Sequence, residues 1–218
     1  MNNPLLNTGA ALLLAPIFYK IFEIILKKED AEYTKVVPYK SLYLLCFLPT
    51  ILYSLVMTYK FGFALYSVLH MVIGVGLAWS CITDLRIREL PDSVTLIFFI
   101  ISLKMFFDQP MDTWLMKILT VVVTTVILYI IWKFVGGLGF GDIKLLIPIL
   151  LSLSPSMYLG FFTNSIFIAF IYAIMILIKT KKDPEADKTF AFGPFLIWGY
   201  YLTLFGISIL EMIVNLIV

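Results

Sequence analysis

The stretch Trp114–Phe134, WLMKILTVVVTTVILYIIWKF, decides the fold class of this chain. It holds no acidic residue, and it is as long as the roughly 20 apolar residues that cross a bilayer as a helix. The whole chain agrees, because 61% of its 218 residues are hydrophobic, only 14% are charged and the mean hydropathy is +1.01. Soluble domains are roughly 45–50% apolar and about 25% charged. The sequence therefore predicts an all-α integral membrane protein.

Outward from this stretch, apolar runs separated by polar breaks predict about eight transmembrane helices in one polytopic bundle. No repeat or soluble linker appears, so we expect residues 1–218 to form a single membrane-embedded domain. Residues 1–10 lack the Lys and Arg of a cleavable signal peptide, so the first helix is expected to be retained. The fourth and sixth runs are short for a full span. The predicted segments are Thr8–Leu26, Leu42–Met57, Phe63–Ile82, Val94–Phe107, Trp114–Phe134, Leu145–Leu153, Met157–Ile178 and Phe195–Ile217.

The positive charges predict the orientation. All but four of the 16 Lys and Arg residues lie in four alternating connections, Lys27–Lys40, Asp84–Asp92, Lys133–Lys144 and Lys179–Lys188. The connections between them hold only Lys60. Because positive loops face the cytoplasm, we expect a multi-pass protein of the cytoplasmic (inner) membrane with both termini outside the cytoplasm.

Polar residues within the predicted spans need partners or access to water. Lys20 and Glu23 are three residues apart on one helix face and are expected to pair. Lys104 and Lys117 are expected to extend toward a membrane interface, because charge at bilayer depth is costly. His70 is read as a polar packing residue rather than a ligand.

Composition argues against several other classes of function. A net charge of +2 is too small to indicate a nucleic-acid partner. Cys46 and Cys81 lie in or beside apolar runs and form no CxxC pair, so they are read as small buried residues. We predict no metal site and no cofactor.

Two aspartates stand at the cytoplasmic ends of predicted helices. Asp84 ends the third span, and Asp142 opens the sixth after the glycine-rich run Gly136–Gly141. Taken alone, either acid is as easily a helix cap or a solvated loop residue. On one face they can form a pair that shares a proton, since two neighbouring carboxyl groups do not both ionise cheaply. One carboxylate then takes a proton from water while the protonated partner polarises a carbonyl, and no metal is needed.

The glycines before Asp142 are expected to supply backbone freedom, including positive φ, and close approach to a substrate. Asp142 itself is predicted to lie at a helix N-terminus, where backbone N–H groups and the helix dipole favour negative charge. Which aspartate holds the shared proton is left open by the sequence.

At these residues the chain resembles a known family. Gly139-Phe-Gly-Asp-Ile-Lys144 is similar to the Gly-x-Gly-Asp signature of the membrane aspartyl proteases that process type IV prepilins. Asp84, followed by Leu90-Pro-Asp92, resembles that family's first-aspartate motif. Phe190-Ala-Phe-Gly-Pro-Phe195 resembles the element before the last span of bacterial members. The three motifs occur in the family's order.

The resemblance implies an aspartic endopeptidase that cleaves the leader peptide of type IV prepilins or pseudopilins after a Gly, at the cytoplasmic face. Asp84 and Asp142 would be the catalytic pair, with Gly139 and Gly141 shaping the second motif. Gly193 and Pro194 would support the site. From its place in the acidic loop after Asp84, we also expect Glu89 to hold basic residues of the leader.

Some features depart from the family pattern. Many bacterial members carry a zinc-binding cysteine insertion between the first two spans and N-methylate the new terminus. Here that loop is only Lys27–Lys40 and holds no cysteine, which leaves methylation, and with it S-adenosylmethionine, undecided. An archaeal-type preflagellin peptidase is the nearest alternative. A small transporter or channel is the alternative from another class, and a structural assembly subunit is a third.

Overall fold

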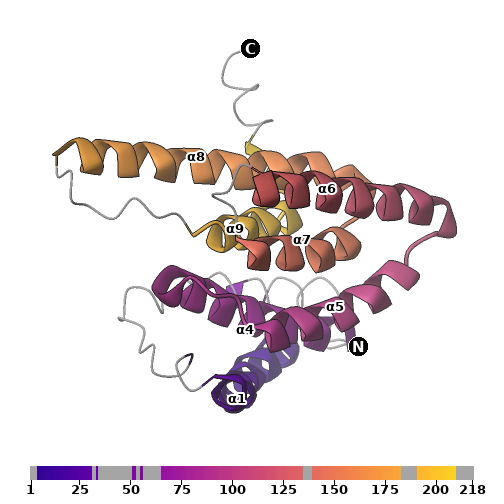
Figure 1. The fold of residues 1–218 in the computed structure, drawn as a ribbon. Helices are drawn as coiled ribbons and strands as arrows, with labels where there is room; N and C mark the ends of the chain where they lie inside the picture. The colour runs from indigo at the N-terminus through magenta and orange to yellow at the C-terminus, as the bar shows by residue number, and fades with distance from the viewer. Residues whose placement is uncertain are drawn as a thin grey trace. The chain divides into compact units, whose positions relative to one another are not determined.

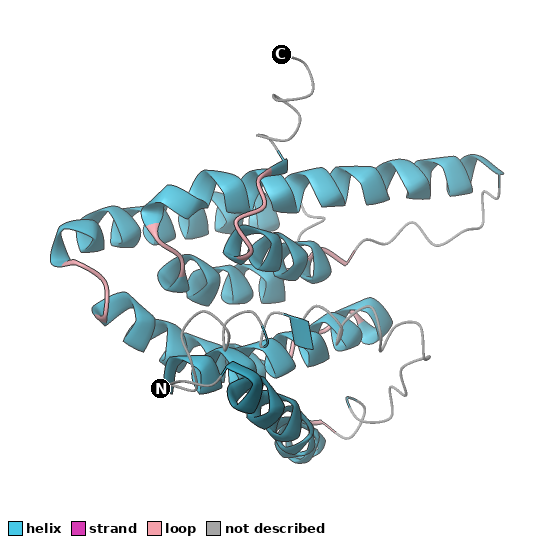
Figure 2. Cartoon of the chain, turned by 180° about the vertical axis from the view of Figure 1, so that it is seen from behind, coloured by secondary structure: helices cyan, strands magenta, loops and turns pink. Residues whose placement is uncertain are grey.

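The computed structural model describes residues 4–30, 33, 51–52, 55, 65–134, 139–182 and 191–209. These residues form helices and loops, and no strand occurs among them (Figures 1 and 2). The all-α class is therefore confirmed for this part of the chain. In order, the elements are α1 (Pro4–Glu29), α4 (Leu65–Ile87), α5 (Asp92–Phe107), η1 (Met111–Thr113), α6 (Trp114–Phe134), α7 (Phe140–Ser152), η2 (Pro155–Met157), α8 (Tyr158–Lys182) and α9 (Gly193–Leu204).

Among the described residues, three helical stretches are long and apolar enough to cross a bilayer. They are Val68–Ile87, Met111–Phe134 and Pro155–Ile178, which correspond to the third, fifth and seventh predicted segments. The helices α5 and α7 contain 16 and 13 residues, fewer than a full span needs. The second predicted segment lies mostly outside the described residues. Eight spans are therefore not confirmed.

The chain divides into two compact units, Met1–Ile101 and Ser102–Val218, and each is described by itself. The first unit packs α1 and α5 against α4. The ring of Tyr19 in α1 stacks on Trp79 in α4 with centroids 5.0 Å apart. Gly76 allows all three helices to approach, since a Cβ there would lie 3.0 Å from both Phe22 Cζ and Val94 Cγ1. Larger side chains at position 76 would separate these helices.

At one end of the first unit, two acidic side chains accept hydrogen bonds that connect neighbouring segments. Glu29, the last residue of α1, accepts hydrogen bonds from the backbone N–H groups of Asp92 (2.8 Å) and Ser93 (3.2 Å) at the start of α5. Tyr33 donates its hydroxyl proton to Glu89 Oε2 at 3.2 Å. The end of α1 and the loop between α4 and α5 thus lie at the same end of the unit. The predicted orientation requires the same arrangement.

The second unit alternates its helix directions (Figure 1). Asn164 near the start of α8 contacts Thr203 near the end of α9, so these two helices are antiparallel. Short connections make α6 and α8 each antiparallel to α7. Ser152 donates to the Tyr200 hydroxyl at 3.2 Å, which joins α7 to α9. The N-termini of α7 and α9 and the C-termini of α6 and α8 consequently share one end of this unit.

The predicted continuous span Phe195–Ile217 is wrong within the described residues, because α9 ends at Leu204. Gly206 then adopts a left-handed φ of 75°, which breaks the helix. The buried Asn164 side chain accommodates the break. Its Nδ2 donates to the carbonyl of Ile207 at 2.8 Å, and its Oδ1 accepts the N–H of Ile209 at 3.0 Å. These bonds replace those that a continuous helix would make.

The predicted Lys20–Glu23 pair is confirmed, with Nζ and Oε2 separated by 2.6 Å. Lys104 is exposed and pairs with Asp108 at 2.7 Å, while its extension toward an interface stays a prediction. Both pairs lie largely in the open, where such contacts contribute little stability.

The prediction that Lys117 extends to an interface is wrong. Lys117 is fully buried, and its ammonium donates to the carbonyl of Leu151 at 2.7 Å while lying 5.5 Å from the centre of the Phe106 ring. The last carbonyls of a helix lack intrahelical donors and carry the negative end of its dipole. Lys117 therefore caps α7 at the end opposite Asp142.

Candidate functional site

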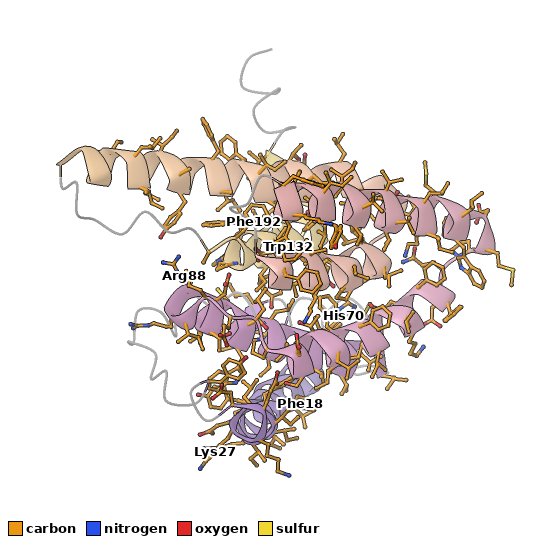
Figure 3. The ribbon with its side chains drawn as sticks, viewed as in Figure 1. Phe18, Lys27, His70, Arg88, Trp132 and Phe192 are labelled. Carbon is orange, nitrogen blue, oxygen red and sulfur yellow. The ribbon has the colours of Figure 1, made fainter. Side chains whose placement is uncertain are left out.

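Asp84 lies in the last turn of α4, and only 6% of its surface is exposed. The helix ends at Ile87, and the N–H of Arg88 donates to the carbonyl of Asp84 at 3.2 Å. Arg88 has a φ of 61°, in the left-handed region that glycine usually occupies at a helix end. Its side chain is exposed beyond the helix (Figure 3). The chain thus stops α4 one turn after Asp84 without a glycine.

Asp142 lies in the first turn of α7, as predicted, and is 5% exposed. Its Oδ2 accepts the N–H of Gly139 at 3.1 Å, and its own N–H donates to the carbonyl of Gly139 at 3.2 Å. The carboxylate therefore closes the start of its own helix. An acid in this place is stabilised in its charged form by the helix dipole.

The prediction of a positive φ does not hold at Gly139. Its φ and ψ are −76° and 142°, an extended conformation that any residue adopts. The constraint is space, because a Cβ at this position would lie 3.1 Å from Asp142 Oδ2. Gly139 thus makes room for the aspartate rather than for a turn. Gly141 lies inside the first turn of α7 and is partly exposed, and Gly136 and Gly137 lie outside the described residues.

Aromatic side chains flank Asp142. Phe140 contacts Trp132 of α6, with ring centroids 5.2 Å apart, and the ammonium of Lys144 lies 5.3 Å from the centre of the Phe140 ring. Phe140 and Trp132 are exposed (Figure 3 labels Trp132). Tryptophan and lysine at the end of an apolar helix are typical of the membrane–water interface. The start of α7 therefore has the chemistry of an interfacial position.

Gly193 and Pro194 begin α9 and are buried. Proline suits the first turn of a helix, where its missing N–H removes no hydrogen bond. Because the N-termini of α7 and α9 share one end of the second unit, both residues lie at the same end as Asp142, Gly139 and Gly141.

Glu89 is exposed in the loop after Asp84 and accepts the Tyr33 hydrogen bond. Burial, followed by the negative charge of Glu89, raises the pKa of Tyr33 to about 12. The sequence does not reveal that Tyr33 binds Glu89 in the loop after Asp84, or that Glu29 binds the start of α5. Glu29 lies 63 positions from the backbone N–H of Asp92 that it binds.

The structure therefore assembles each aspartate with its own neighbours. Asp84 and Glu89 belong to the first unit, and Asp142 belongs to the second with the glycines and Pro194. The juxtaposition of the two aspartates stays a prediction. Within the described ranges, no group of three His, Cys, Asp or Glu side chains gathers as metal ligands would.

Comparison with known proteins gives one match. Residues 71–174, which include both aspartates, match the model of the type IV leader peptidase family. Searches among curated proteins and among solved structures found no match. The match implies a protease that acts on type IV prepilin-like substrates, and the apolar helices agree with a membrane protein. The resemblance drawn from the sequence is thereby confirmed, since residues 71–174 are similar to the type IV leader peptidase family.

Proposed function

We propose that this protein is a membrane aspartic endopeptidase that removes the leaders of type IV prepilins or pseudopilins. Cleavage follows a Gly at the cytoplasmic face, with Asp84 and Asp142 as the catalytic pair. The observation that carries the proposal is that both are buried carboxylic acids at the ends of apolar helices, within the region that matches the family. Aspartates are seldom buried in proteins, so two buried aspartates within one family region point to a functional role.

The chemistry follows from two carboxyl groups in different charge states. Asp142, at a helix N-terminus with the Gly139 N–H on its Oδ2, is assigned the ionised role. It removes a proton from water, and the resulting hydroxide attacks the scissile carbonyl. Protonated Asp84 donates a hydrogen bond to the carbonyl oxygen that becomes negative. The departing amine takes the proton that Asp142 received, which returns the pair to its starting state.

The orientation within the membrane is part of the proposal. Contacts from Glu29 to α5 and from Tyr33 to Glu89 support a common side for the first two lysine- and arginine-rich loops. In the second unit, Lys133 and Lys144 belong to the helix ends that share one side. These ends are assigned to the cytoplasm, where a basic leader would be presented.

The remaining site residues have supporting roles. Gly139 and Gly141 leave space at the start of α7, while Gly193 and Pro194 fix the neighbouring start of α9. Glu89 is assigned to the basic leader, because it is an exposed acid five residues after Asp84.

The test is cleavage of a purified prepilin whose leader ends in Gly, with mass spectrometry to read the cut position and any added methyl group. Asp84→Asn and Asp142→Asn should each lower turnover by about 10²- to 10⁴-fold, the usual contribution of a general acid or base. Asp112→Asn, an exposed change in η1, is the matched control and should cleave normally. Asp92→Asn should be mild. Near-normal turnover in either catalytic variant would remove that aspartate from the mechanism.

A further inference from the structure

Ser80 is a buried polar residue one helical turn before Asp84. Residues four apart lie on the same face of a helix. Ser80 is 0% exposed, and its hydroxyl oxygen has no hydrogen-bond partner among the described residues. Its backbone carbonyl accepts the hydroxyl proton of Thr83 at 3.1 Å, which leaves the Ser80 hydroxyl itself unused. A hydroxyl without a partner therefore lies buried on the Asp84 face of α4.

This arrangement is unfavourable in the resting protein. A buried polar group without a partner costs free energy, and a helical serine normally bonds to a carbonyl one turn earlier. Alanine would fit the same space without that cost. Buried groups of this kind are uncommon enough that each calls for an explanation.

Ser165 provides a comparison, since its hydroxyl is also buried without a partner among the described residues. A packing reason exists there. Ser165 faces Gly199 so closely that a Cβ on the glycine would lie 1.9 Å from the serine oxygen. The crossing of α8 and α9 thus demands small residues at both positions. Ser80 shares its helix face with Asp84, which is a candidate site residue.

We propose that Ser80 is a substrate-binding residue whose hydroxyl binds a backbone group of the substrate just after the scissile bond. This inference rests on the proposed peptidase function. The segment after the cut leads into the substrate's own apolar helix, and the first four N–H groups of a helix have no partner within it. Four residues of α4 span about 6 Å, which places Ser80 one turn deeper than Asp84. A peptide cut at Asp84 brings its unpaired N–H groups to that depth, where the hydroxyl oxygen accepts one of them.

The test combines stability, binding and cleavage. Ser80→Ala should melt at the same temperature as the wild type or higher, because the unpartnered hydroxyl is gone. Its KM should rise roughly 2- to 10-fold with kcat unchanged, which is the effect of losing one hydrogen bond to bound substrate. On an Asp142→Asn background, the Kd for uncleaved prepilin should rise by the same factor. Ser80→Cys keeps a weak hydrogen-bonding group at nearly the same size and should recover part of the affinity.

Ser165→Ala makes the same chemical change and should cleave as the wild type does. A wild-type KM in Ser80→Ala would overturn the proposal. So would a shifted pH profile of kcat at unchanged KM, which would show that the hydroxyl acts on Asp84 instead. Failure of the wild type itself to cut prepilins would refute the peptidase function and is separable from both results.

Discussion

Gly139 and Asp142 bind each other across the first turn of α7 through two reciprocal hydrogen bonds. The Gly139 N–H donates to Asp142 Oδ2 at 3.1 Å, and the Asp142 N–H donates to the Gly139 carbonyl at 3.2 Å. The spacing of the Gly-x-Gly-Asp sequence therefore has a direct structural meaning. The first glycine supplies both an N–H for the carboxylate and the space that the carboxylate occupies.

Gly139→Ala tests this relationship. Its Cβ would meet Asp142 Oδ2 at 3.1 Å, so the carboxylate must move by a few tenths of an ångström. Because small misplacements of catalytic groups cost rate steeply, turnover should fall roughly 10-fold with little loss of stability. Gly160→Ala on α8 is the control, since nothing lies within 4 Å of its Cβ. Equal turnover in both variants would show that Asp142 tolerates displacement.

Glu29→Ala tests the acidic cap on α5. The variant leaves the N–H groups of Asp92 and Ser93 without the carboxylate that binds them, so the free energy of unfolding should fall by about 1 kcal/mol. Thermal unfolding in detergent measures this change. Glu23→Ala removes an acid whose partner is the largely exposed Lys20 and should change stability by less than about 0.5 kcal/mol. Equal losses in the two variants would argue against the cap.

The sequence predicts what depends on neighbours along the chain, and the structure adds what depends on distant partners. Hydropathy located α6 at its observed bounds, and the motif placed Asp142 in the first turn of α7. The sequence did not reveal that Lys117 caps α7, because the Leu151 carbonyl that it binds lies 34 positions away. Asn164 likewise accommodates a helix break 43 positions ahead. Buried polar groups choose partners by geometry, which hydropathy does not encode.

Tyr33 predicts a pH dependence of stability. Burial and Glu89 raise its pKa from 10.0 to about 12, so the folded state holds the phenolic proton more tightly than the unfolded state does. The contribution of Tyr33 to the free energy of unfolding should stay level below pH 10 and fall as pH rises from 10 to about 12. Tyr33→Phe should lose this part of the fall, and Glu89→Gln should make it smaller, because the folded pKa of Tyr33 is then raised less. Thermal melts across pH 8 to 12 provide the measurement, and identical slopes in wild type and Tyr33→Phe would contradict the assignment.

Glu89 is proposed to bind the basic residues of the leader through exposed ion pairs. Exposed ion pairs are typically worth less than about 1 kcal/mol, so Glu89→Gln should raise KM for a basic leader by no more than about 5-fold. The effect should shrink as salt screens the charges, and kcat at saturation should not change.

Losing Glu89 also removes the acceptor for Tyr33, and the design must separate these two consequences. Tyr33→Phe removes the same hydrogen bond while keeping the Glu89 charge, so it is the matched control. If the negative charge of Glu89 is what binds the leader, Tyr33→Phe should retain the wild-type KM and its salt dependence. If the loop's conformation matters instead, the two variants should be impaired alike. A neutralised leader has no cation to pair with Glu89, so the wild type should cleave it with a higher KM than a basic leader. Equal cleavage of the two leaders would show that the enzyme does not recognise leader charge.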